Sequence, residues 1–116
     1  MMKPITVSDA FLIFAKWCDE QPQVHLSMRK KDASWQGGTP VSIIATSQSD
    51  GRVDVQVVVD GKEQPLRLDF RQASFLYGEP SDSAQYPEFA EGRWASYLVV
   101  DTPTTMYLFS ERFAER

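Results

Sequence analysis

The residue types that most often carry out chemistry in proteins are sparse in this chain. It contains one histidine, His25, and one cysteine, Cys18, whereas a metal site needs several His, Cys or carboxylate ligands at suitable spacing. Cys18 falls near the end of a predicted helix beside Asp19 and Glu20, where no cation would stabilise a reactive thiolate. We therefore expect Cys18 to be an inert core residue, and we predict no metal site and no cofactor.

Other catalytic arrangements are weak as well. Glu88 and Glu91 lie three residues apart, a spacing that places both carboxylates on one face of a helical turn. Nothing around them predicts the burial that general acid–base catalysis uses, so an exposed acidic segment is the better interpretation. The chain has no Gly-x-Ser-x-Gly motif, and Gly37-Gly38 lacks the lysine of a phosphate-binding loop. We predict that the protein is not an enzyme.

Aromatic side chains point to a different function. Residues 78–92 form one long irregular segment, and segments longer than about 12–15 residues in compact domains tend to be functional or disordered. Tyrosine and tryptophan are favoured at protein interfaces. The candidate interaction residues are the aromatics in or just after this segment and the tryptophan of the predicted helix: Tyr86, Phe89, Trp94 and Trp17.

Basic residues gather in two places on the predicted strands. Cations next to aromatic residues are a minimal signature of single-stranded nucleic-acid binding. However, Asp32, Asp54 and Asp69 offer these cations partners across a sheet, and the net charge of −4 with a pI near 4.9 argues against general nucleic-acid binding. The candidate basic patch consists of Arg29, Lys30, Lys31, Trp35, Arg67 and Arg71.

The elements that must position these residues begin with a helix. Apolar residues recur at helical spacing over Thr6–Gln21, Thr6 and Asp9 approximate a capping box, and Pro22 ends the segment. The apolar stripe is wider than one helix face. We therefore expect some large apolar residues to exceed the capacity of the core and to form an exposed patch: Leu12, Ile13, Trp17 and Tyr107.

Alternating apolar and polar residues predict about six strands after the helix. Asp50-Gly51 and Asp60-Gly61 each predict a hairpin, because Asp-Gly accepts the positive φ angles of a type I′ turn. We predict a loop over Lys31–Pro40, and the strand at Leu66–Phe70 either continues or kinks into Ala73–Tyr77. The other predicted strands are Val24–Lys30, Val41–Ser47, Arg52–Val59, Trp94–Val100 and Thr105–Phe109.

This order predicts a single α+β domain over residues 1–116, with an N-terminal helix followed by an antiparallel meander. Three architectures fit: a small SH3- or Sm-like barrel, a cystatin-like sheet wrapped around the helix, and a plain α+β sandwich. The layout over Thr6–Tyr77 resembles that of Sm-like proteins. The RNA-binding loops of that family have no match here, so the resemblance assigns no site residue.

The sequence therefore favours a non-enzymatic protein-interaction or scaffold module whose partner is a second copy of itself or another protein. Its excess of large apolar residues and the edge strands of an open meander support this interpretation. The alternatives are a small-barrel nucleic-acid-binding protein and a small-molecule binder with a pocket between helix and sheet. The N-terminal residues predict neither a secretory leader nor a membrane span of about 20 residues, so we expect a cytoplasmic protein without a membrane partner.

Overall fold

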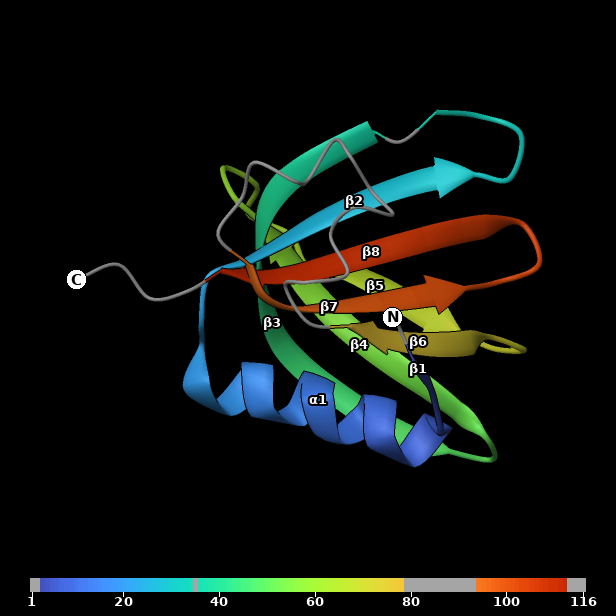
Figure 1. The fold of residues 1–116 in the computed structure, drawn as a ribbon. Helices are drawn as coiled ribbons and strands as arrows, with labels where there is room; N and C mark the ends of the chain where they lie inside the picture. Colours follow the sequence, from blue (N-terminus) through green and yellow to red (C-terminus); the bar gives the residue numbers. More distant parts are fainter. Residues whose placement is uncertain (1–2, 35, 79–93, 113–116) are drawn as a thin grey trace.

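The computed structural model describes residues 3–34, 36–78 and 94–112. Within these residues the chain forms one α-helix and eight strands of a curved sheet (Figure 1). No helix in this part of the chain is long and apolar enough to cross a lipid bilayer. In chain order the elements are β1 (Lys3–Ile5), α1 (Val7–Glu20), β2 (Val24–Lys30), β3 (Gln36–Ser49), β4 (Arg52–Val59), β5 (Leu66–Phe70), β6 (Ser74–Gly78), β7 (Trp94–Asp101) and β8 (Thr105–Arg112).

Local sequence signals set both ends of α1. The Thr6 hydroxyl accepts a hydrogen bond from the backbone N–H of Asp9 at 3.0 Å, and the Asp9 carboxylate accepts one from the N–H of Thr6 at 3.3 Å. This capping box satisfies backbone donors that a helix start otherwise leaves free. Gln21 then adopts a left-handed conformation (φ 51°, ψ 50°) and ends the helix. The predicted helix and capping box are confirmed.

The two Asp-Gly pairs form turns of different kinds. Asp50 and Gly51 have φ angles of 47° and 75°, the pair of positive values that a type I′ turn requires. In the second pair Gly61 has a φ of 84° while Asp60 is not among the residues with positive φ. A positive φ at the third residue alone is the pattern of a type II turn. The type I′ prediction is therefore confirmed for the first pair and wrong for the second.

The strands form an antiparallel sheet in the order β1-β6-β7-β8-β2-β3-β4-β5. β2 to β5 make one run of hairpins, β6 to β8 make another, and the pairing of β8 with β2 joins the two runs. β1 and β5 lie at opposite edges of the described sheet and do not pair with each other. The α+β class and the antiparallel sheet are confirmed. The predicted small barrel is wrong because the sheet does not close, and the prediction of about six strands was too low.

The chain kinks after β5. Gln72 has a left-handed φ of 54° between the two strands, and β6 then pairs with β1 and β7 in the other run of hairpins. Of the two possibilities expected for Ala73–Tyr77, the structure therefore has the kink.

The bend of the sheet lies in β3. The first part of this strand pairs with β2 and the second part with β4, and Val41 is the residue that lies opposite both neighbours. Pro40 immediately precedes it; proline has no N–H for a ladder and is tolerated in a sheet at edges and irregularities. β3 therefore curves strongly (Figure 1). The predicted loop over Lys31–Pro40 is wrong for residues 36–40, which belong to this strand.

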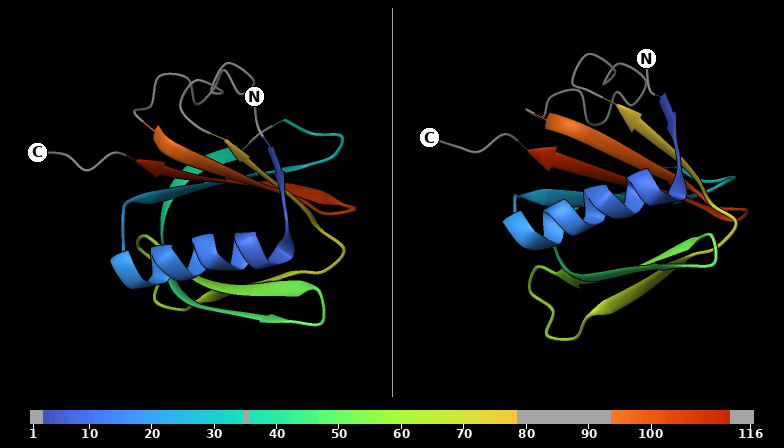
Figure 2. Two further views of the ribbon diagram at one scale, coloured as in Figure 1. Left: turned by 60° about the horizontal axis from the view of Figure 1, so that its bottom comes forward. Right: turned by 90° about the horizontal axis from the view of Figure 1, so that it is seen from below.

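Helix α1 lies in the bend, between β7, β8 and β2 on one side and β3 and β4 on the other (Figure 2). Its buried residues Ala10, Phe14 and Trp17 meet aromatic residues from both parts of the sheet. The Phe14 ring centroid lies 6.0 Å from that of Phe70 on β5 and 5.1 Å from that of Phe109 on β8. Burial of this apolar surface, at roughly 25 cal/mol per Å², holds the helix against both parts.

Trp17 belongs to this core. Its side chain is 2% exposed, and its Nε1 donates a hydrogen bond to Oε1 of Glu111 at 2.9 Å. The expectation that Trp17 forms an exposed patch is therefore wrong, because the bent sheet encloses more interior space than a flat one. Ile13 and Tyr107 are half-buried, whereas Leu12 is 62% exposed.

A second apolar cluster occupies the face of β6, β7 and β8 that points away from the main core. Tyr97, Val99 and Leu108 are buried there, with Leu76 and Met106 packed against them. These residues alternate along their strands with residues of the main core, as the two-residue period of a strand dictates. Burial on both faces explains why the sequence of β7 is nearly continuously apolar.

Candidate functional site

The structure does not bring the two predicted basic groups together. Arg29 and Lys30 end β2 and Lys31 follows them, whereas Arg67 lies on β5 and Arg71 just beyond it. β3 and β4 separate β2 from β5 in the sheet. The described residues therefore form no continuous basic strip across these strands, and nucleic-acid binding stays a prediction without added support.

The first basic group makes local contacts. Lys31 Nζ pairs with the carboxylate of Asp101 at the start of the β7–β8 turn, an aspartate that was not among the expected partners. Arg29 Nη2 donates to Sδ of Met106 at 3.4 Å. These contacts tie the end of β2 to β7 and β8.

The second basic group belongs to a network on the outer face of β4 and β5. Asp54 and Asp69 lie directly opposite each other across the two strands, an arrangement that destabilises a sheet unless cations compensate. Oδ2 of Asp54 lies 3.6 Å from Arg67 Nη2 and 3.7 Å from Arg52 Nε. Oδ2 of Asp69 lies 3.7 Å from Arg52 Nη1 and 2.8 Å from Arg71 Nε. The prediction that these aspartates pair with the basic residues is confirmed.

β5 forms one edge of the described sheet. It pairs with β4 along all five residues, and no described strand pairs with its other side. Backbone N–H and C=O groups of an edge strand are available to an added strand. Leu68 and Phe70 point into the core, whereas Leu66, on the same face, is 43% exposed. The edge of β5 thus offers hydrogen-bonding groups beside an accessible apolar side chain.

Two other edges of the described sheet are covered or blunted. β1 has three residues and contains Pro4, and proline on an edge discourages further pairing. The second part of β3, which has β4 on one side, has α1 along it: Gln21 Nε2 donates to the Ile43 carbonyl at 2.6 Å, and Gln48 Nε2 donates to Ser8 Oγ at 3.0 Å. Covering an edge with a helix is a recognised protection against unwanted pairing.

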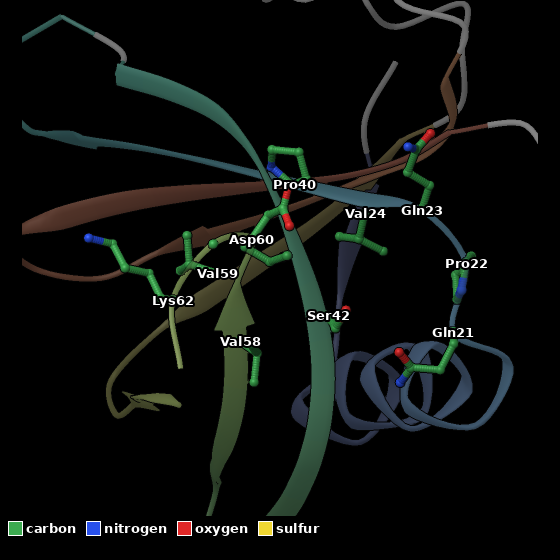
Figure 3. Close-up of a pocket in the computed structure, with 12 residues that line it drawn as sticks. Gln21, Pro22, Gln23, Val24, Pro40, Ser42, Val58, Val59, Asp60 and Lys62 are labelled. Carbon is green, nitrogen blue, oxygen red and sulfur yellow. The ribbon is translucent and has the colours of Figure 1, made fainter. Parts of the chain in front are cut away.

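A hollow of about 520 Å³ lies where the end of α1, the start of β2, the middle of β3 and the β4–β5 turn meet (Figure 3). Its volume is in the range of ligand sites. Valines form part of its wall, and Gln21, Asp60 and Lys62 supply an amide, a carboxylate and an ammonium group. The Gln21 amide is engaged by the carbonyls of Ile43 and Cys18. The hollow therefore combines apolar side chains with polar and charged ones.

Of the remaining aromatic residues in the predicted sites, only Trp94 lies in the part of the chain that the structure describes. Tyr86, Phe89 and Trp35 lie outside the described residues. Trp94 begins β7 and pairs in register with Arg112. The predictions for these four aromatic residues therefore stay predictions.

Sequence reasoning missed the edge of β5 as a site. The strand itself was predicted, but its position in the sheet depends on β8 pairing with β2 and on the kink after Phe70. Neither is encoded in local periodicity. The exposure of Leu66 was missed for the same reason. By its place in the alternating pattern of the strand, Leu66 would be expected to face the core.

Comparison with known proteins does not assign a function. No protein-family model matches the chain, and neither a curated protein nor a solved structure matches it. Across residues 3–34, 36–78 and 94–112 no group of three or more His, Cys, Asp or Glu side chains is placed to hold a metal ion.

Proposed function

We propose that this chain is a non-enzymatic protein-interaction module that docks an extended segment of its partner on the outer edge of β5. The observation that carries the proposal is the pairing of β5 on one side only. Addition of a strand to an exposed edge is a common mode of recognition, in which main-chain hydrogen bonds supply affinity and alternate side chains supply specificity.

The contrast among the edges supports this proposal. β1 is short and contains a proline, and the second part of β3 has α1 along it, whereas β5 carries neither device along Leu66–Phe70. We also propose that the architecture is the helix-wrapped, cystatin-like one, since α1 lies in the bend of the sheet (Figure 2). β5 pairs with β4 along all five of its residues, and a strand that is already ordered loses less conformational freedom when a partner segment pairs with it.

Site-specific photo-crosslinking in the cells that produce the protein tests the proposal. A photoreactive phenylalanine replaces Leu66 at the edge of β5 or, as a matched control, the exposed Leu12 on the outer side of α1. We expect a discrete protein adduct from position 66 and none of the same mass from position 12. Failure of position 66 to give an adduct, or an identical adduct from both positions, would contradict docking on β5.

The hollow beside Gln21 favours a second candidate function, the binding of a small polar molecule. Its volume of about 520 Å³ and its mixture of valines and polar groups support this alternative. Native mass spectrometry of freshly purified protein is the measurement that separates the two. A reproducible small mass that is lost when Lys62 and Asp60 are both changed to alanine would support ligand binding in the hollow.

A further inference from the structure

The side chains of β5 have a pattern that identifies a partner. Arg67 and Asp69 lie on the outer face of the strand, and Leu66, Leu68 and Phe70 lie on the inner face. The two charged residues have opposite signs and lie symmetrically about Leu68. A strand with this pattern is complementary to itself when it runs antiparallel to a second copy.

We propose that the segment docked on β5 is the β5 strand of a second copy of this chain, antiparallel and centred on Leu68. This inference rests on the function proposed above. In this register Arg67 lies opposite the partner's Asp69 and Asp69 opposite the partner's Arg67. Leu66 lies opposite the partner's Phe70, and the two Leu68 side chains lie opposite each other at the two-fold axis. An isologous contact of this kind is the commonest way in which soluble proteins form dimers.

Other registers of the same strand fit less well. Centring the pair on Arg67 places two guanidinium groups opposite each other, and centring it on Asp69 does the same with two carboxylates; like charges directly opposite are destabilising. A shift by one residue puts a charged outer-face residue opposite a leucine of the inner face. Among the registers that lie within these central residues of β5, charge and apolar pattern therefore favour the one centred on Leu68.

The charged side chains of this contact are accessible, whereas Leu68 and Phe70 stay buried in the core of their own chain. The side chain of Arg67 is 65% exposed and that of Asp69 is 36% exposed. Leu66, whose apolar surface is exposed at the end of β5, gains a neighbour from the inner face of the partner. A five-residue strand pair buries less than the roughly 1,000 Å² of a stable interface. We therefore expect a dimer that forms at high protein concentration and dissociates on dilution.

Sedimentation velocity over a range of protein concentrations tests the proposal through charge reversal. Arg67→Asp and Asp69→Arg each place like charges opposite each other at both ends of the strand pair. We expect each variant to associate at least tenfold more weakly than the unmodified chain, which corresponds to about 1.4 kcal/mol. An equal mixture of the two variants restores opposite charges at every position, so we expect heterodimers to form. Lys16→Glu, on the exposed side of α1, is the control and is expected to leave association unchanged.

A measurement on the unmodified chain guards against variants that do not fold. Hydrogen exchange of the backbone amides in Leu66–Phe70 is expected to slow as protein concentration rises, while the amides of α1 stay unchanged. A chain that remains monomeric at the highest concentration, with no added protection in β5, overturns self-association. So does a dimer that neither Arg67→Asp nor Asp69→Arg weakens. Either result leaves the crosslinking test from Leu66 free to detect a different protein on the same edge, so the two proposals fail separately.

Discussion

Replacing Trp17 with alanine removes the largest fully buried side chain of the described core. The indole contacts the rings of Phe14 and Phe109, with centroid distances of 5.9 and 6.2 Å, and its Nε1 donates to Glu111 at 2.9 Å. The substitution therefore leaves a cavity between α1 and β8 and removes a hydrogen bond to a carboxylate. We expect the variant to be less stable than the unmodified chain.

The magnitude follows from the burial. Truncation of a buried tryptophan to alanine costs about 3–5 kcal/mol, including the cavity that remains. Glu111 is only half-buried, so its carboxylate can be hydrated after the indole is lost and adds little to the cost. We expect a decrease of about 4 kcal/mol in the free energy of unfolding, which is a large part of the roughly 5–15 kcal/mol that stabilises a typical domain.

Urea denaturation followed by far-ultraviolet circular dichroism measures this loss. Trp17→Phe retains an aromatic ring and is expected to cost less than Trp17→Ala. Leu12→Ala on the exposed side of the same helix is the matched control, and we expect it to change the free energy of unfolding by less than about 0.5 kcal/mol. A loss below about 1 kcal/mol for Trp17→Ala, or equal losses at both positions, would refute the assignment of Trp17 to the core.

Two further predictions concern the ends of elements and are checked by thermal unfolding. Thr6→Ala removes the hydroxyl that caps α1, and we expect it to lower the free energy of unfolding by about 1 kcal/mol. Thr6→Ser retains the acceptor and is expected to have nearly the stability of the unmodified chain. Equal melting temperatures for the two variants would contradict the capping role. Gly51→Ala meets no atom within 4 Å of the added Cβ but must keep a φ of 75°, so we expect a cost of about 1 kcal/mol from backbone strain alone. A stabilised Gly51→Ala variant would show that the turn does not have this geometry.

Local signals in the sequence were sufficient for the helix, for most of the strands and for some of their ends. The capping box of Thr6 and Asp9, the end of the helix before Pro22 and the turn at Asp50-Gly51 each depend on contacts between residues that are close in the chain. Intrinsic propensity and local hydrogen bonds decide such structures. The predicted strand at Val24–Lys30 has the same bounds in the structure. These features do not depend on what the rest of the chain does.

Long-range pairing accounts for most of what the sequence did not predict. The barrel was one of three architectures that fit the predicted meander, because strand pairing and curvature cannot be read from periodicity. In the structure β8 pairs with β2 across more than 70 residues of chain and leaves β5 at an edge. Trp17 was expected at the surface because the bend of β3 at Val41 cannot be inferred from alternation. The candidate site on β5 depends on both the pairing of β8 with β2 and the bend of β3. β5 is an edge strand only because no other strand is placed beside it, and local sequence does not reveal this.

β8 is synthesised after every other described strand, yet it lies in the interior of the sheet. While the ribosome is still translating residues 105–112, β2 and β7 have no neighbour on the sides that β8 will later occupy. Because a ribosome adds roughly 5–20 residues per second, the chain spends a short time in this incomplete state. Until β8 is in place, β7 and β2 each have a free edge, and a free edge can pair with a strand of a neighbouring nascent chain. A chain that ends before Thr105 would therefore lack the strand that joins the two runs of hairpins into one sheet.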